Sequence, residues 1–103
     1  MNLEEFNNIK QNQQLTLIYF STQTCNVCKV LKPQIKALID AYPPWRFVYI
    51  DGQDSSTVAA QNMVFSAPAL ILYVEGKEVA RFGRHFGLHE LEDILSRYQE
   101  LLA

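Results

Sequence analysis

A junction between a predicted strand and a predicted helix carries both cysteines of this chain. Residues 15–21 form a continuous apolar run, which is typical of a strand that is covered on both faces. Cys25 follows closely, and from residue 27 apolar side chains recur at helical spacing to about Tyr42. Because a helix start offers negative charge unpaired backbone N–H groups and a favourable dipole, Cys25 is a candidate thiolate. Cys28 lies one turn away, near enough to form a disulfide with it.

The rest of the chain alternates between strand-like and helix-like patterns. The predicted segments are a short helix at 2–11, the strand 15–21, the helix after the cysteines, a strand at 47–50, a weaker helix at 55–64, strands at 69–74 and 78–82, and a helix from Leu88. The turn Glu75-Gly76-Lys77 joins the last two strands as a hairpin. Strands that alternate with helices imply a parallel pair made by a right-handed crossover. We therefore expect an α/β fold in which helices cover both faces of a central, mixed four-stranded β-sheet.

The helix after the cysteines should bend, and one of its sides should face solvent. Pro33 interrupts it, and a proline ring displaces one backbone hydrogen bond, so we expect a kink there. Three lysines line the side opposite the apolar residues and suit a solvated face, namely Lys29, Lys32 and Lys36. Charged residues in the last predicted strand, at 78–82, suit an exposed edge of the sheet.

Length and composition indicate one ordinary globular domain, residues 1–103. The chain is 49% hydrophobic with a net charge of −2, so it lacks the excess of Lys and Arg that sequence-independent nucleic-acid binding needs. The longest apolar stretch, residues 67–74, is far shorter than the ~20 residues that span a bilayer. Early acidic residues argue against a signal peptide. We therefore expect no nucleic-acid or membrane partner and a cytoplasmic location, where a lone Cys-x-x-Cys pair is seldom structural.

Over about residues 3–102, the sequence resembles the thioredoxin family. Four features carry the resemblance: the Cys-x-x-Cys pair at a strand-to-helix junction, Pro33 five residues after Cys28, Ser66-Ala67-Pro68 directly before a strand, and Gly76 in the next hairpin turn. The resemblance implies a thioredoxin-like fold in which Pro68 is a cis-proline beside the cysteines. It also implies a thiol–disulfide oxidoreductase that acts on protein disulfides without a cofactor or a metal ion.

Several positions depart from the family pattern. Thr24 stands where thioredoxins usually have a tryptophan, and Asn26-Val27 replace Gly-Pro between the cysteines. Tyr19 and Phe47 occupy the positions of the family's buried Asp and of its Lys in the next strand. The N-terminal first strand of many thioredoxins is also missing, because no apolar run precedes the first predicted helix. The sequence is that of a divergent thioredoxin-like protein with a Cys-Asn-Val-Cys motif.

The residues and the resemblance together predict a division of labour at the site. Cys25 attacks a substrate disulfide as a thiolate, and Cys28 then attacks Cys25 and releases the reduced substrate. The backbone of Ala67, turned by Pro68, pairs with an extended segment of the substrate. Thr24 gives that substrate a smaller contact than the usual aromatic residue.

Further residues are predicted to support the exchange. Asn26 and Val27 both supply backbone N–H donors that stabilise a thiolate, and Lys29 follows the motif directly. Tyr19 is a poor proton acceptor for Cys28, because an ordinary tyrosine has a pKa of ~10. We expect water or the released substrate thiolate to take that proton. The expected partners are disulfide-bearing proteins, with a thioredoxin reductase or a low-molecular-weight thiol as electron donor, and the protein should be a monomer.

Three other functions remain open on the sequence alone. A thioredoxin-fold binding module would hold a partner while its cysteines stay nearly idle. A glutaredoxin-like enzyme for low-molecular-weight thiols would carry an aromatic residue within its Cys-x-x-Cys and a Gly-Gly turn, whereas Phe82-Gly83-Arg84 has one glycine. A zinc site needs four ligands, and the two cysteines lie much farther from His85 and His89 than ligand pairs do in zinc fingers.

Overall fold

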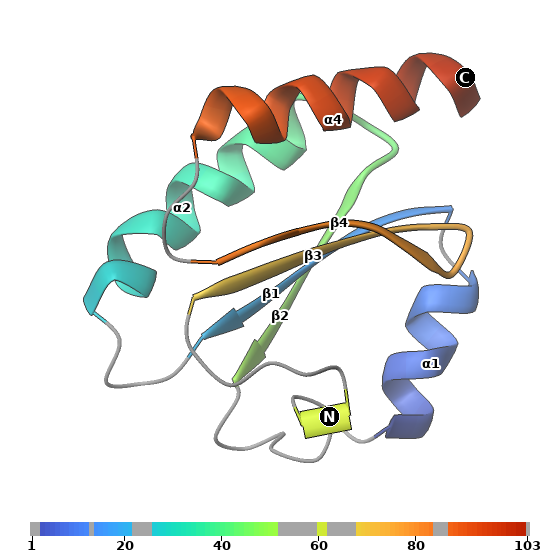
Figure 1. Ribbon diagram of the computed structural model, residues 1–103, viewed down its shortest axis with the longest axis horizontal. Helices are drawn as coiled ribbons and strands as arrows, with labels where there is room; N and C mark the ends of the chain where they lie inside the picture. The colour runs from blue at the N-terminus through green and yellow to red at the C-terminus, as the bar shows by residue number, and fades with distance from the viewer. Residues whose placement is uncertain are drawn as a thin grey trace.

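Four strands form one sheet, and helices of the described chain pack on both of its faces. The computed structural model describes residues 3–12, 14–21, 26–51, 60–61, 68–83 and 87–102. The strands are β1 (Leu15–Ser21), β2 (Arg46–Asp51), β3 (Ala69–Val74) and β4 (Lys77–Phe82). The helices are α1 (Leu3–Asn12), α2 (Asn26–Asp40) and α4 (Leu88–Leu102). Figure 1 shows α2 and α4 on one face of the sheet and α1 on the other.

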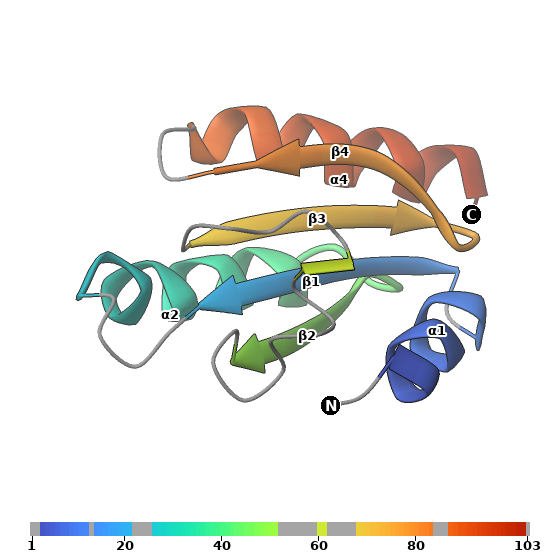
Figure 2. The ribbon, with the colours of Figure 1, turned by 60° about the horizontal axis from the view of Figure 1, so that its bottom comes forward.

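The sheet has the strand order β2-β1-β3-β4, and the strands lie side by side in that order in Figure 2. β1 runs parallel to β2, to which the α2 crossover connects it, and antiparallel to β3. β3 and β4 form the antiparallel hairpin. This arrangement confirms the predicted α/β fold with its mixed four-stranded sheet. In the part of the chain that is described, α1 comes first and no strand precedes β1.

The helix α2 is shorter than predicted. It ends at Asp40 and not near Tyr42, because the amides of Ala41 and Tyr42 bond carbonyls three residues back, at 3.1 and 3.0 Å, and tighten the helix end into turns. Pro33 lies inside α2, which continues on both sides of it. Of the weaker helix predicted at 55–64, only residues 60 and 61 are described, and both are helical.

The strand ends also differ slightly from the predicted ones. β2 begins one residue earlier, at Arg46, and β4 begins at Lys77. The hairpin turn therefore has two residues, Glu75 and Gly76, whose φ angles of 53° and 85° fit the left-handed backbone of a type I′ turn. This turn type matches the natural twist of paired strands, which is why the ladder continues one residue farther than the predicted three-residue turn allowed. β4 is an edge strand, as its charges predicted.

Alternation along the strands divides the core into two clusters, one on each face of the sheet. The α2/α4 cluster consists of Leu15, Leu17, Tyr19, Ile35, Ile39, Trp45, Leu70, Leu72, Leu91 and Leu95. The α1 cluster consists of Phe6, Ile18, Phe20, Ile50, Ala69, Ile71 and Tyr73. β1 and β3 supply side chains to both clusters, so they form the centre of the molecule.

Two hydrogen bonds fasten α4 to the loop that follows α2. The indole Nε1 of Trp45 donates to the carbonyl of Leu95 at 2.9 Å. The side-chain amide of Gln99 donates to the carbonyl of Pro43. Because this loop joins α2 to β2, α4 and α2 hold each other in place on the same face of the sheet.

Candidate active site

The cysteine motif follows the end of β1 and runs into the first turn of α2. The helix begins at Asn26, so Cys28 belongs to its first turn. Thr24 and Cys25 lie outside the described residues, as do the side chains of residues 26–28. The described backbone agrees with the predicted strand-to-helix junction, while the roles assigned to the two thiols stay predictions.

Pro68 lies at the same edge of the sheet as this junction. It is buried and directly precedes β3, whose first residue, Ala69, pairs with Phe20 near the end of β1. The fold thus brings the predicted substrate-binding proline next to the strand that leads to Cys25. Ala67 and the peptide bond that joins it to Pro68 lie outside the described residues, so the cis geometry stays a prediction.

Tyr19 belongs to an aromatic layer on the face of the sheet that α2 covers. Its side chain has no exposed surface. Its ring centroid lies 5.9 Å from that of Phe47 and 6.2 Å from that of Tyr49, on which it stacks. Burial, together with the nearby Tyr49, raises the pKa of Tyr19 to about 12. The phenol therefore stays protonated at neutral pH and does not act as a base there.

A cluster that the sequence analysis missed lies beside this layer, and we call it the Lys32–Tyr49–Ser21 cluster. Ser21 Oγ donates a hydrogen bond to the hydroxyl of Tyr49 at 2.7 Å. Lys32 Nζ lies 3.9 Å from the centroid of the Tyr49 ring, within the range of a cation–π contact. The predicted solvated face is therefore right for Lys29, which is exposed, and wrong for Lys32, which is half-buried against the ring.

The sequence contained only part of the signal for this cluster. Lys32 follows Cys28 by one helical turn, which could have been read from the spacing. The contact with Tyr49 depends instead on the parallel register of β1 and β2, in which Tyr19 pairs with Tyr49. That register emerges only from the folded sheet.

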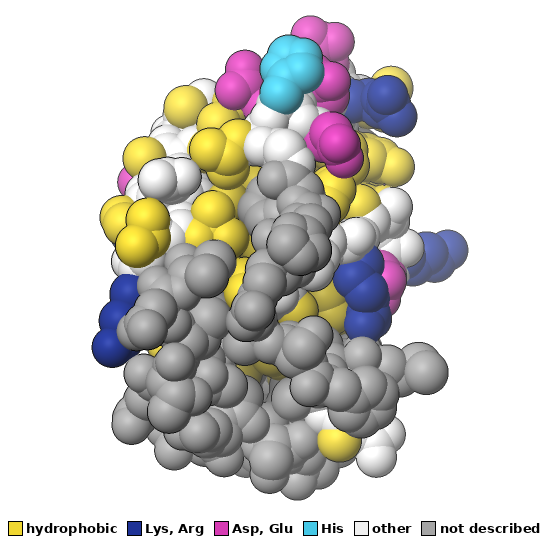
Figure 3. Space-filling model, turned by 60° about the vertical axis from the view of Figure 1, so that its left-hand side comes forward, with side chains coloured by type: hydrophobic (Ala, Val, Ile, Leu, Met, Phe, Trp, Pro, Cys, Tyr) yellow, Lys and Arg dark blue, Asp and Glu magenta, His cyan; other side chains and the backbone are white. Residues whose placement is uncertain are grey.

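Charge is divided between the two helices on this face. Before Asp40, α2 carries only basic charged residues, which are Lys29, Lys32 and Lys36. Lys36 pairs with Asp40 at 3.5 Å. α4 is mainly acidic, and Figure 3 shows Asp and Glu side chains gathered over it, at the top of the view. Positive charge in the first half of α2 adds to the helix dipole in favouring a thiolate at the helix start.

The described residues contain no group of three or more His, Cys, Asp or Glu side chains that could hold a metal ion. His89 is exposed near the start of α4, with Nε2 3.8 Å from an Asp93 carboxylate oxygen. His85, Cys25 and the side chain of Cys28 lie outside the described part of the chain, so the zinc alternative is not tested. No described helix is long and apolar enough to span a membrane.

Comparison with known sequences gives consistent matches. The sequence model of the Thioredoxin family matches residues 1–97. The chain is 33% identical over 101 residues to the thioredoxin-like protein YdfQ of Bacillus subtilis, a match that covers 98% of this chain and 88% of that protein. It is 37% identical over 81 residues to mitochondrial thioredoxin-3 of Saccharomyces cerevisiae, which covers 78% of this chain and 63% of that protein.

Solved structures agree with the sequence matches. The oxidized form of yeast mitochondrial thioredoxin 3 has a TM-score of 0.83 at 30% identity, and the match covers 93% of this chain and 90% of that chain. A chain from a structure of the thiol resolving mechanism in yeast mitochondrial 1-Cys peroxiredoxin via glutathione/thioredoxin systems has a TM-score of 0.84 at 29% identity, with the same coverage. Together with the strand order and the position of the Cys-x-x-Cys pair, these matches show that this chain belongs to the thioredoxin family.

Proposed function

We propose that this chain is a thiol–disulfide oxidoreductase that acts on protein disulfides through Cys25 and Cys28. The observation that carries the proposal is the position of its only two cysteines in a thioredoxin-family fold: Cys25 precedes α2, after β1, and Cys28 belongs to the first turn of α2. Relatives in this family are typically disulfide oxidoreductases. The basic first half of α2 supports the same proposal, because it favours the thiolate that the chemistry needs.

In the proposed cycle, the Cys25 thiolate attacks one sulfur of a substrate disulfide. A bond forms between the two sulfurs, the substrate S–S bond breaks, and its electron pair leaves on the second substrate sulfur. Cys28 then attacks the sulfur of Cys25, and the first substrate sulfur leaves as a thiolate. The substrate gains two electrons and becomes a dithiol, while Cys25 and Cys28 become a disulfide. A protein dithiol or a low-molecular-weight thiol then reduces this pair.

Cys28 loses a proton during this cycle, and Tyr19 does not accept it. Because burial keeps Tyr19 protonated at neutral pH, water or the departing substrate thiolate takes the proton in our proposal. The resulting enzyme works without the buried carboxylate that the family usually places here.

The rest of the proposed site serves substrate binding. Pro68, Ala67 and Thr24 would contact an extended segment of the substrate protein, while Asn26 and Val27 supply N–H donors to the thiolate. A monomer in the cytoplasm stays our prediction, although one relative, thioredoxin-3 of yeast, is mitochondrial.

Trapping of mixed disulfides distinguishes this enzyme from a passive binding module. Cys28→Ser removes the resolving thiol, so the variant should accumulate covalent adducts with disulfide-bearing proteins, all of them cleaved by dithiothreitol. Cys25→Ser is the matched control and should form none. Mass spectrometry of the adducts should locate the bond at Cys25. Equal amounts of adduct with both variants, or none with Cys28→Ser, would contradict the proposal.

A further inference from the structure

We propose that Lys32, held in place by Tyr49 and Ser21, is the electrostatic partner that stabilises the thiolate of the resolving Cys28. The inference rests on the proposed function and assigns a role in its second step. It concerns a cation that does not belong to the Cys-x-x-Cys motif and that the sequence analysis placed on a solvated face.

Lys32 lies one helical turn after Cys28 in α2. Cys28 and Lys32 are four residues apart in α2, and residues at that spacing lie on the same face of a helix, about 5–6 Å apart at their Cβ atoms. Lys29 is also close in sequence but is exposed on the helix surface. Lys36 lies a further turn away and pairs with Asp40. Lys32 is therefore the lysine of this helix that is best placed to act on residue 28.

The Lys32 side chain is anchored toward the sheet. Its ammonium group lies 3.9 Å from the centre of the Tyr49 ring, and the hydroxyl of Tyr49 accepts a 2.7 Å hydrogen bond from the buried Ser21. Ser21 is the last residue of β1, directly before the segment that leads to Cys25. The Tyr49 ring also stacks on Tyr19. Through Tyr49, the lysine is thus linked to the end of the strand from which the motif continues.

The charge of Lys32 has no ion-pair partner among the side chains that the structure describes. The described ion pairs join other residues, and the side chain of Asp51 is not among those described. The described group that faces it from the sheet is the Tyr49 ring, and the other lysines of α2 are Lys29 and Lys36. Asp51 is the nearest acid by register, since it pairs with Ser21. An ammonium group near a thiol favours the ionised form of that thiol.

A two-step reaction with a small disulfide separates the two cysteines. One equivalent of dithiodipyridine, which is uncharged, reacts with the reduced protein and releases one thiopyridone when Cys25 attacks. A second thiopyridone is released when Cys28 attacks the sulfur of Cys25 in this mixed disulfide. Removing the cation with Lys32→Met should lower the thiolate fraction of Cys28 about ten-fold. Because a more basic thiolate is also a better nucleophile, the second step should slow by about three-fold or more near neutral pH.

The pH profile separates an electrostatic role from a structural one. The slowing should shrink as pH rises and Cys28 ionises in both proteins, whereas the first release should stay within about two-fold throughout. Lys32→Arg should behave like the wild type, because it keeps the charge and the ring contact. Lys36→Met, which removes a neighbouring lysine of the same helix, should leave both steps unchanged. Tyr49→Leu should slow the second step to a smaller degree, because the lysine loses its anchor.

Two results would overturn the inference. One is a second step in Lys32→Met that is as fast as in the wild type near neutral pH. The other is an equal slowing in Lys36→Met. A wild-type protein that releases no second equivalent would instead contradict the proposed function, and the role of Lys32 would be refuted with it.

Discussion

The two faces of the sheet differ in the described helices that cover them. On the α2/α4 face, two helices of 15 residues each cover a continuous cluster of buried side chains. On the α1 face, the described helix is α1, with 10 residues, and among its described side chains Phe6 is the one in the buried cluster. The motif-bearing helix thus shares its face of the sheet with a second helix of the same length. We infer that the orientation of α2 depends on that layer, while α1 behaves as a more separable unit.

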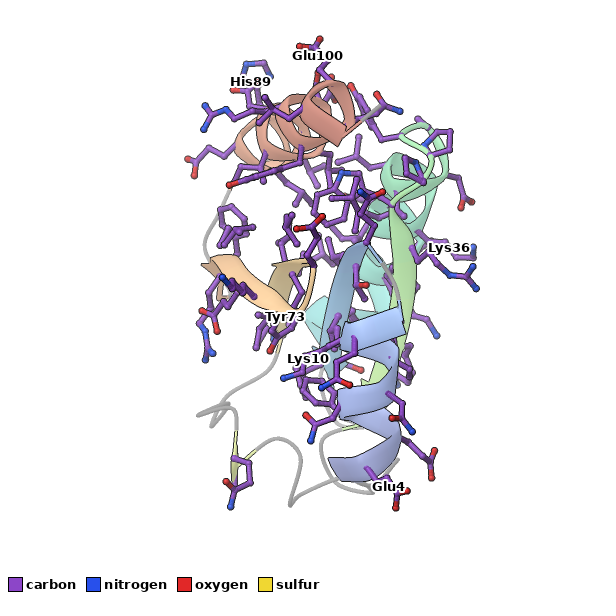
Figure 4. The ribbon with its side chains drawn as sticks, turned by 90° about the vertical axis from the view of Figure 1, so that its right-hand side faces the viewer. Glu4, Lys10, Lys36, Tyr73, His89 and Glu100 are labelled. Carbon is purple, nitrogen blue, oxygen red and sulfur yellow. The ribbon has the colours of Figure 1, made fainter. Side chains whose placement is uncertain are left out.

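A small aromatic group attaches α1 to the sheet. The Phe6 ring centroid lies 6.0 Å from that of Tyr73, edge to face, and 6.4 Å from that of Phe20. Lys10 Nζ covers the group, 4.9 Å from the Phe6 centroid and 5.2 Å from that of Tyr73; Figure 4 shows Lys10 beside Tyr73. Such a compact attachment should fail locally before the opposite face opens.

Trp45→Ala should have the largest effect on stability. The substitution removes a buried ring from the α2/α4 cluster and leaves the Leu95 carbonyl without its indole donor. We expect the free energy of unfolding to fall by about 3–5 kcal/mol in urea denaturation. Trp45→Phe keeps most of the ring and should cost about 1 kcal/mol for the lost hydrogen bond. A smaller loss for Trp45→Ala than for Phe6→Ala would contradict the comparison of the two faces.

Phe6→Ala should have a smaller and more local effect. We expect the free energy of unfolding to fall by about 3 kcal/mol, which is at the low end for the loss of a buried phenylalanine ring, because α1 can detach without opening the other face. Hydrogen exchange should show faster exchange of the α1 amides and nearly unchanged protection in α2. Equal loss of protection in both helices would mean that the two faces unfold as one unit.

Alkaline titration should sharpen the comparison, because each face holds one buried tyrosine. Burial raises the pKa of Tyr19 and of Tyr73 to about 12. In the unfolded chain both phenols ionise near a pKa of ~10. Their contribution to the free energy of unfolding should therefore be constant below that pH and fall as pH rises from about 10 to 12. Tyr19→Phe and Tyr73→Phe should each reduce this decline.

Local opening should separate the two tyrosines in this titration. Since α1 detaches more readily, Tyr73 should ionise at a lower pH than Tyr19. The measurement is the tyrosinate absorbance of Tyr19→Phe and of Tyr73→Phe as the pH is raised. The reverse order would show that the α1 face is the more firmly closed one.

The fold was largely predictable, because its periodic patterns are strong and local. The apolar run of β1, the helical spacing of α2 and the hairpin after Ala69 each specify an element without reference to the rest of the chain. The element ends were less certain, since they depend on individual turns such as the two residues Glu75 and Gly76.

The surroundings of the candidate site were only partly predictable. The Cys-x-x-Cys pair and the aromatic replacement at Tyr19 can be read directly from the sequence. The contact between Lys32 and Tyr49 cannot, because it joins a helix to an edge strand through the parallel register of β1 and β2. A stripe of lysines on an amphipathic helix predicts a solvated face, and only the folded sheet places a ring under one of them.

Single-turnover reduction of insulin by the prereduced protein tests the central claim most directly. The account predicts that each molecule reduces one insulin disulfide and that alkylation of the product finds Cys25 and Cys28 joined in a disulfide. Cys25→Ser should abolish the reaction. Insulin left intact by the prereduced wild type, or reduced equally well by Cys25→Ser, would contradict it.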